Sequence, residues 1–563
     1  MNVFKYVGII MACSLLGMAC YDDLGNYKYK EINDMIVNMP RSYSVKIPNS
    51  DSTQVVVSPK ITQTLQSSNS NLRYEWKRQT GRTWTVCGQE ETLSFYIYPS
   101  DQGNISLVLA VTDASQNIVA YQETTIRLVH AYTNCWFVMQ EINGQTVLGA
   151  IDGLGEVRVV SKDVYKQETG GSIPGKPLFL SVNNRHLYGP FDRPGIEPVL
   201  GVYTQAYCGT LDPSNLSERY SYERMLLAKM NTGFTSRPLY ADGAWGGECV
   251  IDDGVFWYAF GDGHSIYYPV KLDEEAGSSY YATMANMDAY HCVNIIFDNE
   301  NKRFLQYSNT DYGMSHFRHE KIDYDKNYAL YDVNDKWANG VKLRLLGENP
   351  KKANVFDPDH IGGKEVVFMG PTSNVDEPDI IAIARENNGS LLHIYEFNTR
   401  ALAGRIKDAA FCSGYFTVNI LEAGGKKLSL ACSGYFDRMF FYACGNKICR
   451  ADLNWSVPRV YDILNLEKDL GLPASAEIVA LKFCSVCSDH GYYPEGSGEY
   501  DDPILYRLPG KLAAVVRNGS EDSVIEMDLT AAGDVKRYEN KKPIVYEFKG
   551  FENVVDLRYV YRW

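Results

Sequence analysis

Two cysteines near the C-terminal end form the most suggestive group of metal-type ligands in this sequence. Cys484 and Cys487 make a Cys-x-x-Cys pair, and His490 follows them. A structural zinc site needs four ligands, usually from two such pairs. Cys444 and Cys449 are the nearest candidates, but they lie on either side of a predicted turn. Because paired cysteines in exported proteins favour disulfides, we predict a disulfide between Cys484 and Cys487 and no metal site.

Two histidine-containing segments offer weaker candidates. His316 and His319 are three positions apart, but no helical pattern surrounds them to place both on one face, so we interpret them as surface residues. The segment 357–360 reads Asp-Pro-Asp-His, which suits a cation-binding or catalytic loop. It also suits an ordinary polar turn, which we favour.

Recognised catalytic motifs are absent from the sequence. It has no His-Glu-x-x-His, no Gly-x-Ser-x-Gly, no P-loop and no complete EF-hand loop. A glycosidase needs two positioned carboxylates, but with 69 acidic residues the spacing selects no pair. The sequence therefore names no catalytic residue, no cofactor and no ligand-binding residue, and we favour a non-catalytic role while leaving enzymatic activity open.

The N-terminal segment offers a different chemistry, lipid attachment. Residues 6–19 form an apolar run preceded by Lys5. The run is shorter than the roughly 20 residues that span a bilayer, and it is typical of a signal peptide. We therefore expect residues 1–19 to be a signal peptide, followed by a linker over residues 20–34.

Cys20 lies directly after this run, with Ala19 and Gly17 at the small-residue positions before it. The arrangement resembles the lipobox of bacterial lipoproteins, in which the cysteine after the cut receives diacylglycerol. It departs from the family pattern because Leu16 is four rather than three residues before the cysteine. Cys13 also follows a lipobox-like segment, but too short an apolar run precedes it. The resemblance implies that Cys20 is the lipid-attachment site; the alternative is a plain signal peptide with a chance cysteine.

Acidic residues follow the cysteine. Asp22 and Asp23 resemble the surface-export signal of Bacteroidetes lipoproteins, and the stretch CYDDLGNYKYKEIN over residues 20–33 resembles the start of the PKD-like family lipoproteins of that phylum. Such proteins are commonly encoded beside TonB-dependent outer-membrane transporters. The resemblance implies a lipid-anchored protein of the cell outer membrane, exposed at the surface, with a TonB-dependent transporter complex as a partner.

Composition supports a globular, strand-rich chain. The protein has 563 residues, of which 41 are tyrosine, a residue that favours strands. Its formal charge of −14 makes nucleic acid an unfavourable partner, since an acidic chain repels phosphate backbones.

Residues 35–131 show period-two alternation. Leu72, Tyr74 and Trp76 alternate with charged residues, and similar runs follow with polar turns between them. This pattern predicts an antiparallel β-sandwich. Tyr74-x-Trp76 resembles a PKD or immunoglobulin-like domain, in which the tryptophan fills the core. Cys87 is the only cysteine here, so no disulfide can form within the domain, and we expect it to act as a spacer.

Residues 132–563 contain recurring hairpins, each an apolar strand, a turn with Gly or Asn, and a second strand. They start near residues 136, 255, 380, 439 and 512, with weaker ones near 186 and 303. Units of about 60 residues that repeat in this way indicate a β-propeller of about seven blades. Separate β-sandwiches are the alternative, but no linker-like segment interrupts the region. Two Cys-Ser-Gly-Tyr-Phe copies, at 412–416 and 432–436, suggest a short duplication.

These patterns together predict an all-β protein, a PKD/immunoglobulin-like β-sandwich followed by a β-propeller. We expect a membrane-anchored surface lipoprotein that binds a glycan, a peptide or protein, or an uptake-complex partner. The alternatives are a propeller-based hydrolase or lyase acting on an extracellular polymer, and a purely structural adapter of a transporter. The segment Phe256-Trp257-Tyr258 is the most aromatic strand, and we interpret it as buried rather than ligand-binding.

Overall fold

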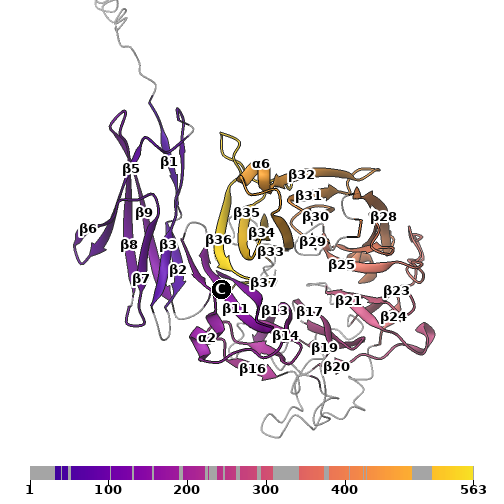
Figure 1. The fold of residues 1–563 in the computed structure, drawn as a ribbon. Helices are drawn as coiled ribbons and strands as arrows, with labels where there is room; N and C mark the ends of the chain where they lie inside the picture. Colours follow the sequence, from indigo (N-terminus) through magenta and orange to yellow (C-terminus); the bar gives the residue numbers. More distant parts are fainter. Residues whose placement is uncertain are drawn as a thin grey trace, which may run out of the picture.

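The computed structural model confirms an all-β protein (Figure 1). The helical segments in its described part are short: α2 (Val164–Thr169), η2 (Glu274–Ala276), α5 (Thr399–Leu402) and α6 (Leu466–Leu470). The structure describes residues 32–561 apart from 40, 48–51, 67, 102, 130–131, 133, 155–156, 189–193, 222–225, 227–236, 245–246, 261–266, 288–292, 309–341, 373–378, 405, 422–423, 426–427 and 485–509.

The first part of the chain forms a sandwich of strands around Trp76. One sheet has the order β2-β9-β8-β5-β6, and facing it are β3 and β7. Trp76 is fully buried between them, and its Nε1 donates to the Glu90 carbonyl at 3.0 Å. The strands are β1 (Met35–Asn38), β2 (Ser42–Lys46), β3 (Thr53–Val57), β4 (Lys60–Gln63), β5 (Leu72–Thr80), β6 (Thr83–Gly88), β7 (Leu93–Ile97), β8 (Asn104–Asp113) and β9 (Ile118–Val129).

The rest of the chain forms four-stranded units arranged around a common centre (Figure 1). The first unit is β37 (Val554–Tyr561), β10 (Asn134–Ile142), β11 (Gln145–Leu154) and β12 (Val157–Ser161). Next come β13 (Pro177–Tyr188), β14 (Pro194–Thr204), β15 (Cys208–Leu211) and β16 (Glu218–Ser221), then β17 (Pro238–Ala244), β18 (Gly247–Asp252), β19 (Val255–Phe260) and β20 (Tyr268–Pro269).

The remaining units follow the same antiparallel order. They are β21 (Ala282–Met287), β22 (Val293–Asp298), β23 (Arg303–Ser308) and β24 (Arg344–Leu345); β25 (Glu365–Thr372), β26 (Asp379–Arg385), β27 (Leu391–Phe397) and β28 (Cys412–Asn419); β29 (Ser429–Ala431), β30 (Met439–Cys444), β31 (Lys447–Asp452) and β32 (Arg459–Asn465); and β33 (Glu477–Phe483), β34 (Lys511–Asn518), β35 (Glu521–Asp528) and β36 (Val545–Phe551).

Packing joins these sheets in a ring. Each pair of neighbouring sheets encloses its own hydrophobic cluster, and the cluster around Trp136, Val515 and Leu557 joins the last sheet to the first. Central strands such as β26 are therefore buried on both faces, which explains the continuous apolar run over residues 380–384. Strand β37 completes the first sheet by pairing with β10, so the two ends of the region are held together.

The predicted hairpins are largely confirmed. Those starting near 136, 380, 439 and 512 are the second and third strands of their sheets, namely β10–β11, β26–β27, β30–β31 and β34–β35. The hairpin starting near 255 is β19–β20, the third and fourth strands of its sheet. The repeat is real, but that hairpin is one strand out of phase with the others.

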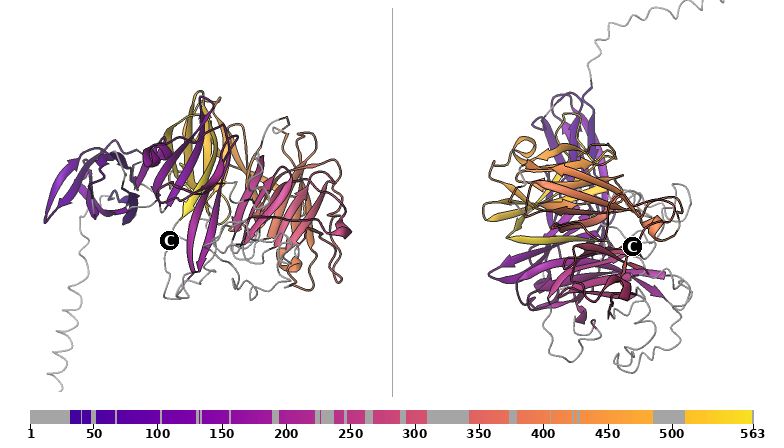
Figure 2. Two further views of the ribbon diagram at one scale, coloured as in Figure 1. Left: turned by 90° about the horizontal axis from the view of Figure 1, so that it is seen from below. Right: turned by 90° about the vertical axis from the view of Figure 1, so that its right-hand side faces the viewer.

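The sandwich and the ring share a sheet. Strand β3 pairs with β12, so the first ring sheet continues into the sandwich in the order β37-β10-β11-β12-β3-β7. The Lys46 backbone N–H donates to Asp152 Oδ2 at 2.9 Å, and the Lys46 ammonium pairs with the buried Glu168 carboxylate. Figure 2 shows the sandwich lying beside the ring. A spacer formed by this domain would therefore be fixed to the ring by backbone pairing.

Candidate functional site

The residues predicted for export and disulfide chemistry lie mostly outside the described residues. These are Cys20, Asp22, Asp23, Cys487 and His490, together with the histidines at 316 and 319. Cys484 is described and is buried in the cluster between the last sheet and the first. The lipid-attachment, export and disulfide predictions therefore stay predictions. Among the described residues, none of the helices has the length and apolar character needed to cross a membrane.

The Asp-Pro-Asp-His segment is a turn. The Asp359 N–H donates to Asp357 Oδ1 at 2.9 Å, and the Pro358 carbonyl accepts the Phe304 N–H at 2.8 Å. Both interactions are local or structural. Over the described part of the chain, no group of three or more His, Cys, Asp or Glu side chains is placed to hold a metal ion.

The most aromatic strand is buried as expected. Phe256, Trp257 and Tyr258 are at most 2% exposed within β19. Exposed aromatic side chains occur elsewhere on the ring, at one end of the sheet β29–β32. There, Tyr435 in the β29–β30 loop is 40% exposed and Trp455 in the β31–β32 loop is 44% exposed.

We call residues 432–438 and 453–458 the loop pair. Hydrogen bonds fix the two loops to each other: the Leu453 N–H donates to the Arg438 carbonyl and Asn454 Nδ2 donates to the Asp437 carbonyl, both at 2.9 Å. The β29–β30 and β31–β32 loops lie two strands apart on the sheet. Because neighbouring strands are about 4.8 Å apart, roughly 10 Å separates the two loops. The loop pair therefore presents two aromatic rings from one fixed platform.

Local packing sets which aromatic side chain is exposed. Phe436 is fully buried against Phe441 and Phe483, with ring centroids 5.1 and 5.6 Å away. Its neighbour Tyr435 is therefore directed outward. On the other loop, Trp455 Nε1 donates to Asp452 Oδ2 at 3.2 Å, and the Arg459 guanidinium lies 3.4 Å from the Trp455 ring centroid.

A charged pair lies at the base of the loop pair. Arg438 Nε donates to Glu396 Oε1 and Arg438 Nη2 donates to Glu396 Oε2, both at 2.8 Å. The Glu396 side chain is 4% exposed and that of Arg438 is 33% exposed. Gly414 provides the room for this carboxylate, since a Cβ at that position would lie 2.5 Å from Glu396 Oε2.

A second carboxyl group lies on the same face of the neighbouring sheet. Ile381 pairs with Glu396, so Asp379, two residues earlier, is its diagonal neighbour. Burial, together with the nearby Glu396 charge, raises the pKa of Asp379 to about 7. Arg438 holds Glu396 in an ion pair, so Asp379 lies beside a carboxyl group that already has a cationic partner.

This arrangement supports two kinds of chemistry. Exposed aromatic faces beside charged and hydrogen-bonding groups can hold a sugar ring by stacking and by bonds to its hydroxyls. A carboxyl group with a pKa near 7 can transfer a proton. The sequence analysis identified neither the exposed Tyr435 and Trp455 nor the Asp379 carboxyl group. It did single out the Cys-Ser-Gly-Tyr-Phe copy at 432–436, which forms part of one loop. The copy at 412–416 lies in strand β28, so the two copies adopt different structures.

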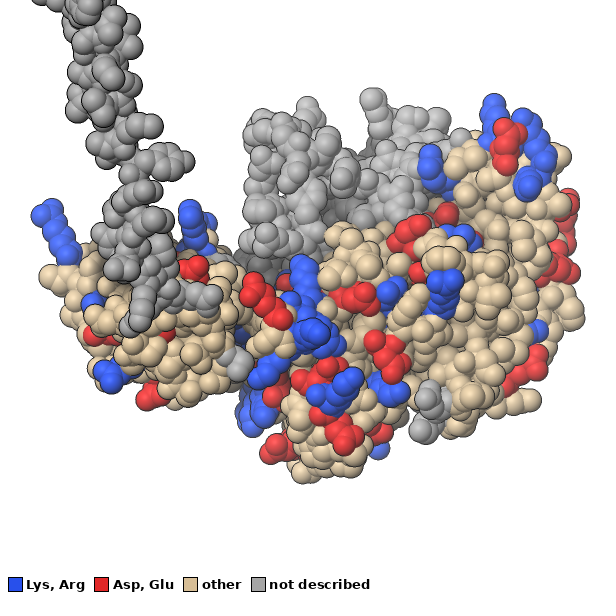
Figure 3. All heavy atoms as spheres, turned by 90° about the horizontal axis from the view of Figure 1, so that it is seen from above, with Lys and Arg blue, Asp and Glu red and all other residues tan. Residues whose placement is uncertain are grey.

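Charged side chains form no single-sign patch on the face seen in Figure 3. Figure 3 shows positive and negative side chains interspersed over the face that it displays. The buried carboxylate Glu526 contacts Arg158, Lys511 and Trp136, where it joins the last sheet to the first. It is fully buried and serves packing of the ring.

Comparison with known proteins gives a family match to part of the chain. The sequence model of the PKD-like family matches residues 20–177, which extends through the sandwich into β10–β12 and α2. No curated protein matches.

Solved structures match the chain only at low sequence identity and low TM-score. A quinonprotein alcohol dehydrogenase-like protein from Bacteroides thetaiotaomicron is 10% identical with a TM-score of 0.40, covering 92% of this chain and 95% of that one. AztD from Citrobacter koseri is 9% identical with a TM-score of 0.31, covering 87% of this chain and 97% of that one.

Proposed function

We propose that this chain is a lipid-anchored binding protein of the bacterial outer-membrane surface, and that its loop pair binds a glycan without catalysis. The anchoring part is supported by the lipobox-like Cys20 and the acidic Asp22 and Asp23. The match of residues 20–177 to the PKD-like family is compatible with it. A TonB-dependent transporter complex is the proposed partner at the membrane.

The fold supports a display role. We propose that the ring is a seven-bladed β-propeller, because the described strands form seven four-stranded units and β37 completes the first of them. Such an arrangement leaves only short, protected sheet edges at its centre and makes a rigid platform. The domain division that we propose is a sandwich over residues 35–131 and a propeller over 132–563.

The exposure of Tyr435 and Trp455 on joined loops carries the ligand proposal. Single exposed aromatic side chains are common on protein surfaces, but here two of them lie on loops that hydrogen bonds join, so one ligand could cover both and remove their apolar area from water. Asp437, two residues after Tyr435, is exposed, and the exposed Arg459 lies against the Trp455 ring, so polar side chains accompany both rings. The loop pair carries both positive and negative side chains, so it has no single-sign surface to attract an acidic or a basic peptide. Apolar ring faces beside polar groups match a sugar chain better.

A second candidate function is a hydrolase or lyase that uses Asp379. Its raised pKa favours general acid–base chemistry at neutral pH. The bidentate Arg438 contact disfavours this candidate, because it fixes Glu396 in a structural role between two sheets rather than leaving it free to react. The non-catalytic proposal is therefore preferred.

A binding screen tests the proposal. The purified protein is titrated against a panel of glycans and a panel of peptides by calorimetry. Trp455→Ala and Tyr435→Ala should each weaken glycan binding about 10-fold, the effect of losing about 1.4 kcal/mol of stacking. Tyr415→Ala is the matched control, because Tyr415 has the same 40% exposure but lies on β28.

The outcomes separate the candidates. Failure of every glycan to bind, or binding that both loop variants leave unchanged, would contradict the proposal. New reducing ends in the glycan samples that disappear with Asp379→Asn would establish the enzymatic candidate instead.

A further inference from the structure

Strand β6 is an open edge of the sandwich. It ends the sheet order β2-β9-β8-β5-β6 and, among the described strands, pairs with β5 alone. Figure 1 places it on the side of the sandwich farthest from the ring. All of its residues from Thr83 to Cys87 are exposed.

The composition of β6 leaves this edge unprotected. Its sequence Thr-Trp-Thr-Val-Cys-Gly has no charge and no proline, and its residues favour strands. Exposed edges normally carry lysine, proline or a bulge to prevent strand addition. The single irregularity in its pairing with β5 lies at Cys87, beyond the regular stretch from Thr83 to Val86.

The ladder directs alternate backbone groups toward solvent. Thr83 pairs with Thr80 across a two-residue turn, which makes this the hydrogen-bonded pair that closes the hairpin, and the Arg78–Thr85 pair two positions along is hydrogen-bonded in the same way. The backbone N–H and C=O groups of Thr83 and Thr85 therefore face β5. In an antiparallel ladder the residues between them turn their N–H and C=O groups the other way. Trp84 and Val86 therefore present donors and acceptors at the free edge, and their side chains are 43% and 52% exposed.

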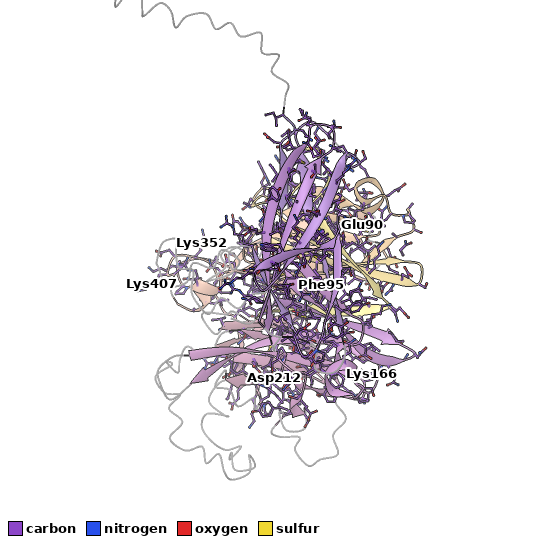
Figure 4. The ribbon with its side chains drawn as sticks, turned by 90° about the vertical axis from the view of Figure 1, so that its left-hand side faces the viewer. Glu90, Phe95, Lys166, Asp212, Lys352 and Lys407 are labelled. Carbon is purple, nitrogen blue, oxygen red and sulfur yellow. The ribbon has the colours of Figure 1, made fainter. Side chains whose placement is uncertain are left out.

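This geometry is complementary to itself. When two β6 strands pair antiparallel about a two-fold axis at Thr85, Trp84 of each copy lies opposite Val86 of the other. The two Trp84–Val86 pairs then form backbone hydrogen bonds across the new interface. Each Trp84 ring packs on the β-branched Val86 side chain of the other copy, which is a favourable cross-strand pair. The same register brings Arg82, in the β5–β6 turn, diagonally next to Glu90 after β6 of the other copy. Figure 4 labels Glu90 on the sandwich.

We infer that β6 is a docking edge for a second copy of this chain, and that the dimer forms by antiparallel β6–β6 pairing centred on Thr85. The interface is isologous, as expected for a two-fold dimer. It uses none of the residues of the loop pair and is independent of ligand binding.

Disulfide trapping in cells tests the pairing and its register. Residues at the axis of a non-hydrogen-bonded pair have Cα atoms about 4.5 Å apart, which suits a disulfide. The full-length chain with Thr85→Cys and Cys87→Ser should give a covalent dimer after mild oxidation, seen on a non-reducing gel. The control, Thr83→Cys with Cys87→Ser, should give none, because residue 83 lies opposite residue 87 of the second copy, which carries no thiol in that variant.

A proline substitution gives an independent readout. Val86→Pro removes only an N–H that faces the free edge, so it should abolish the Thr85→Cys cross-link while the hairpin with β5 and the unfolding midpoint are retained. Val86→Thr should keep the cross-link. Absence of a dimer with Thr85→Cys, equal cross-linking at positions 83 and 85, or a cross-link to a different protein would each overturn the inference.

Discussion

Arg438 and Glu396 form a two-pronged ion pair between adjacent sheets, with both nitrogen–oxygen distances at 2.8 Å. Arg438 directly precedes β30 at the end of the first loop of the loop pair, and Glu396 lies near the end of β27. The pair therefore ties the exposed aromatic platform to the neighbouring sheet, so its loss should affect both stability and the position of Tyr435.

Removing Arg438 should destabilise the protein. Arg438→Met leaves the buried Glu396 carboxylate without its cation, which costs roughly 2–3 kcal/mol, less than for a fully buried pair because Arg438 is one-third exposed. Urea unfolding midpoints measure the loss. Adding Glu396→Gln to Arg438→Met should recover part of it, and a double variant less stable than the single one would argue against this account.

The space at Gly414 gives a second check on the same carboxylate. Gly414→Ala places a methyl group 2.5 Å from Glu396 Oε2, so the carboxylate must move and its bonds to Arg438 must lengthen. We expect a loss of stability of about 1–3 kcal/mol, seen as a lower unfolding midpoint. Gly363→Ala is the control, since no atom lies within 4 Å of its added Cβ; equal effects at both positions would contradict the prediction.

Acid should weaken the junction between the last and first sheets. Burial opposes ionisation of Glu526, but Arg158 and Lys511 lower its pKa to about 2, from 4.5. A lowered folded-state pKa means that the stabilisation is complete above pH 4.5 and is lost as the pH falls toward 2. The stability gap between wild type and Glu526→Gln should therefore be large at about pH 7 and smaller at about pH 3. The exposed Glu539→Gln should show no such gap, and a gap for Glu526→Gln that grows on acidification would refute the assignment.

Local sequence predicted the hairpins because their turns depend on neighbouring residues. Asn143 and Gly144 both adopt positive φ, of 52° and 74°, as a tight hairpin turn requires. The sequence carries a further local signal at the ends of three strands. Asp212 and Asn398 directly follow the third strand of their sheets, and Asp452 is the last residue of its third strand. Each comes after an apolar residue, and each side chain accepts a backbone N–H two or three residues later. That recurring residue would have marked where the third strand of those sheets ends.

Contacts between distant segments could not be predicted in this way. Glu396 and Arg438 are 42 positions apart, and Lys46 and Asp152 are 106 apart. Neither pair has a spacing that a helix or hairpin would impose, because only the ring and its junction with the sandwich bring them together. The exposure of Tyr435 likewise depends on the burial of Phe436 by a neighbouring sheet.

Loss of Cys20 should release the protein from membranes. If the lipid on Cys20 is the anchor, Cys20→Ala leaves the chain without its acyl chains, and the protein should move to the soluble fraction after cell lysis. Cys87→Ala is the control and should stay with membranes. Continued membrane association of the Cys20 variant would rule out anchoring at this residue.

The junction between the sandwich and the ring should respond to neutral pH. Asp152 is buried at this junction, where its Oδ2 accepts the Lys46 N–H, and burial raises its pKa to about 7 from 3.8. A raised folded-state pKa means that ionisation is disfavoured in the fold, so stability is highest below pH 3.8 and falls as the pH rises toward 7. Asp152→Asn keeps an oxygen acceptor but cannot ionise, so it should raise the unfolding midpoint at about pH 8 and change it little at about pH 4. Tryptophan fluorescence during thermal unfolding at both pH values measures this, and a stability loss at the higher pH would show that the Asp152 charge supports the junction instead.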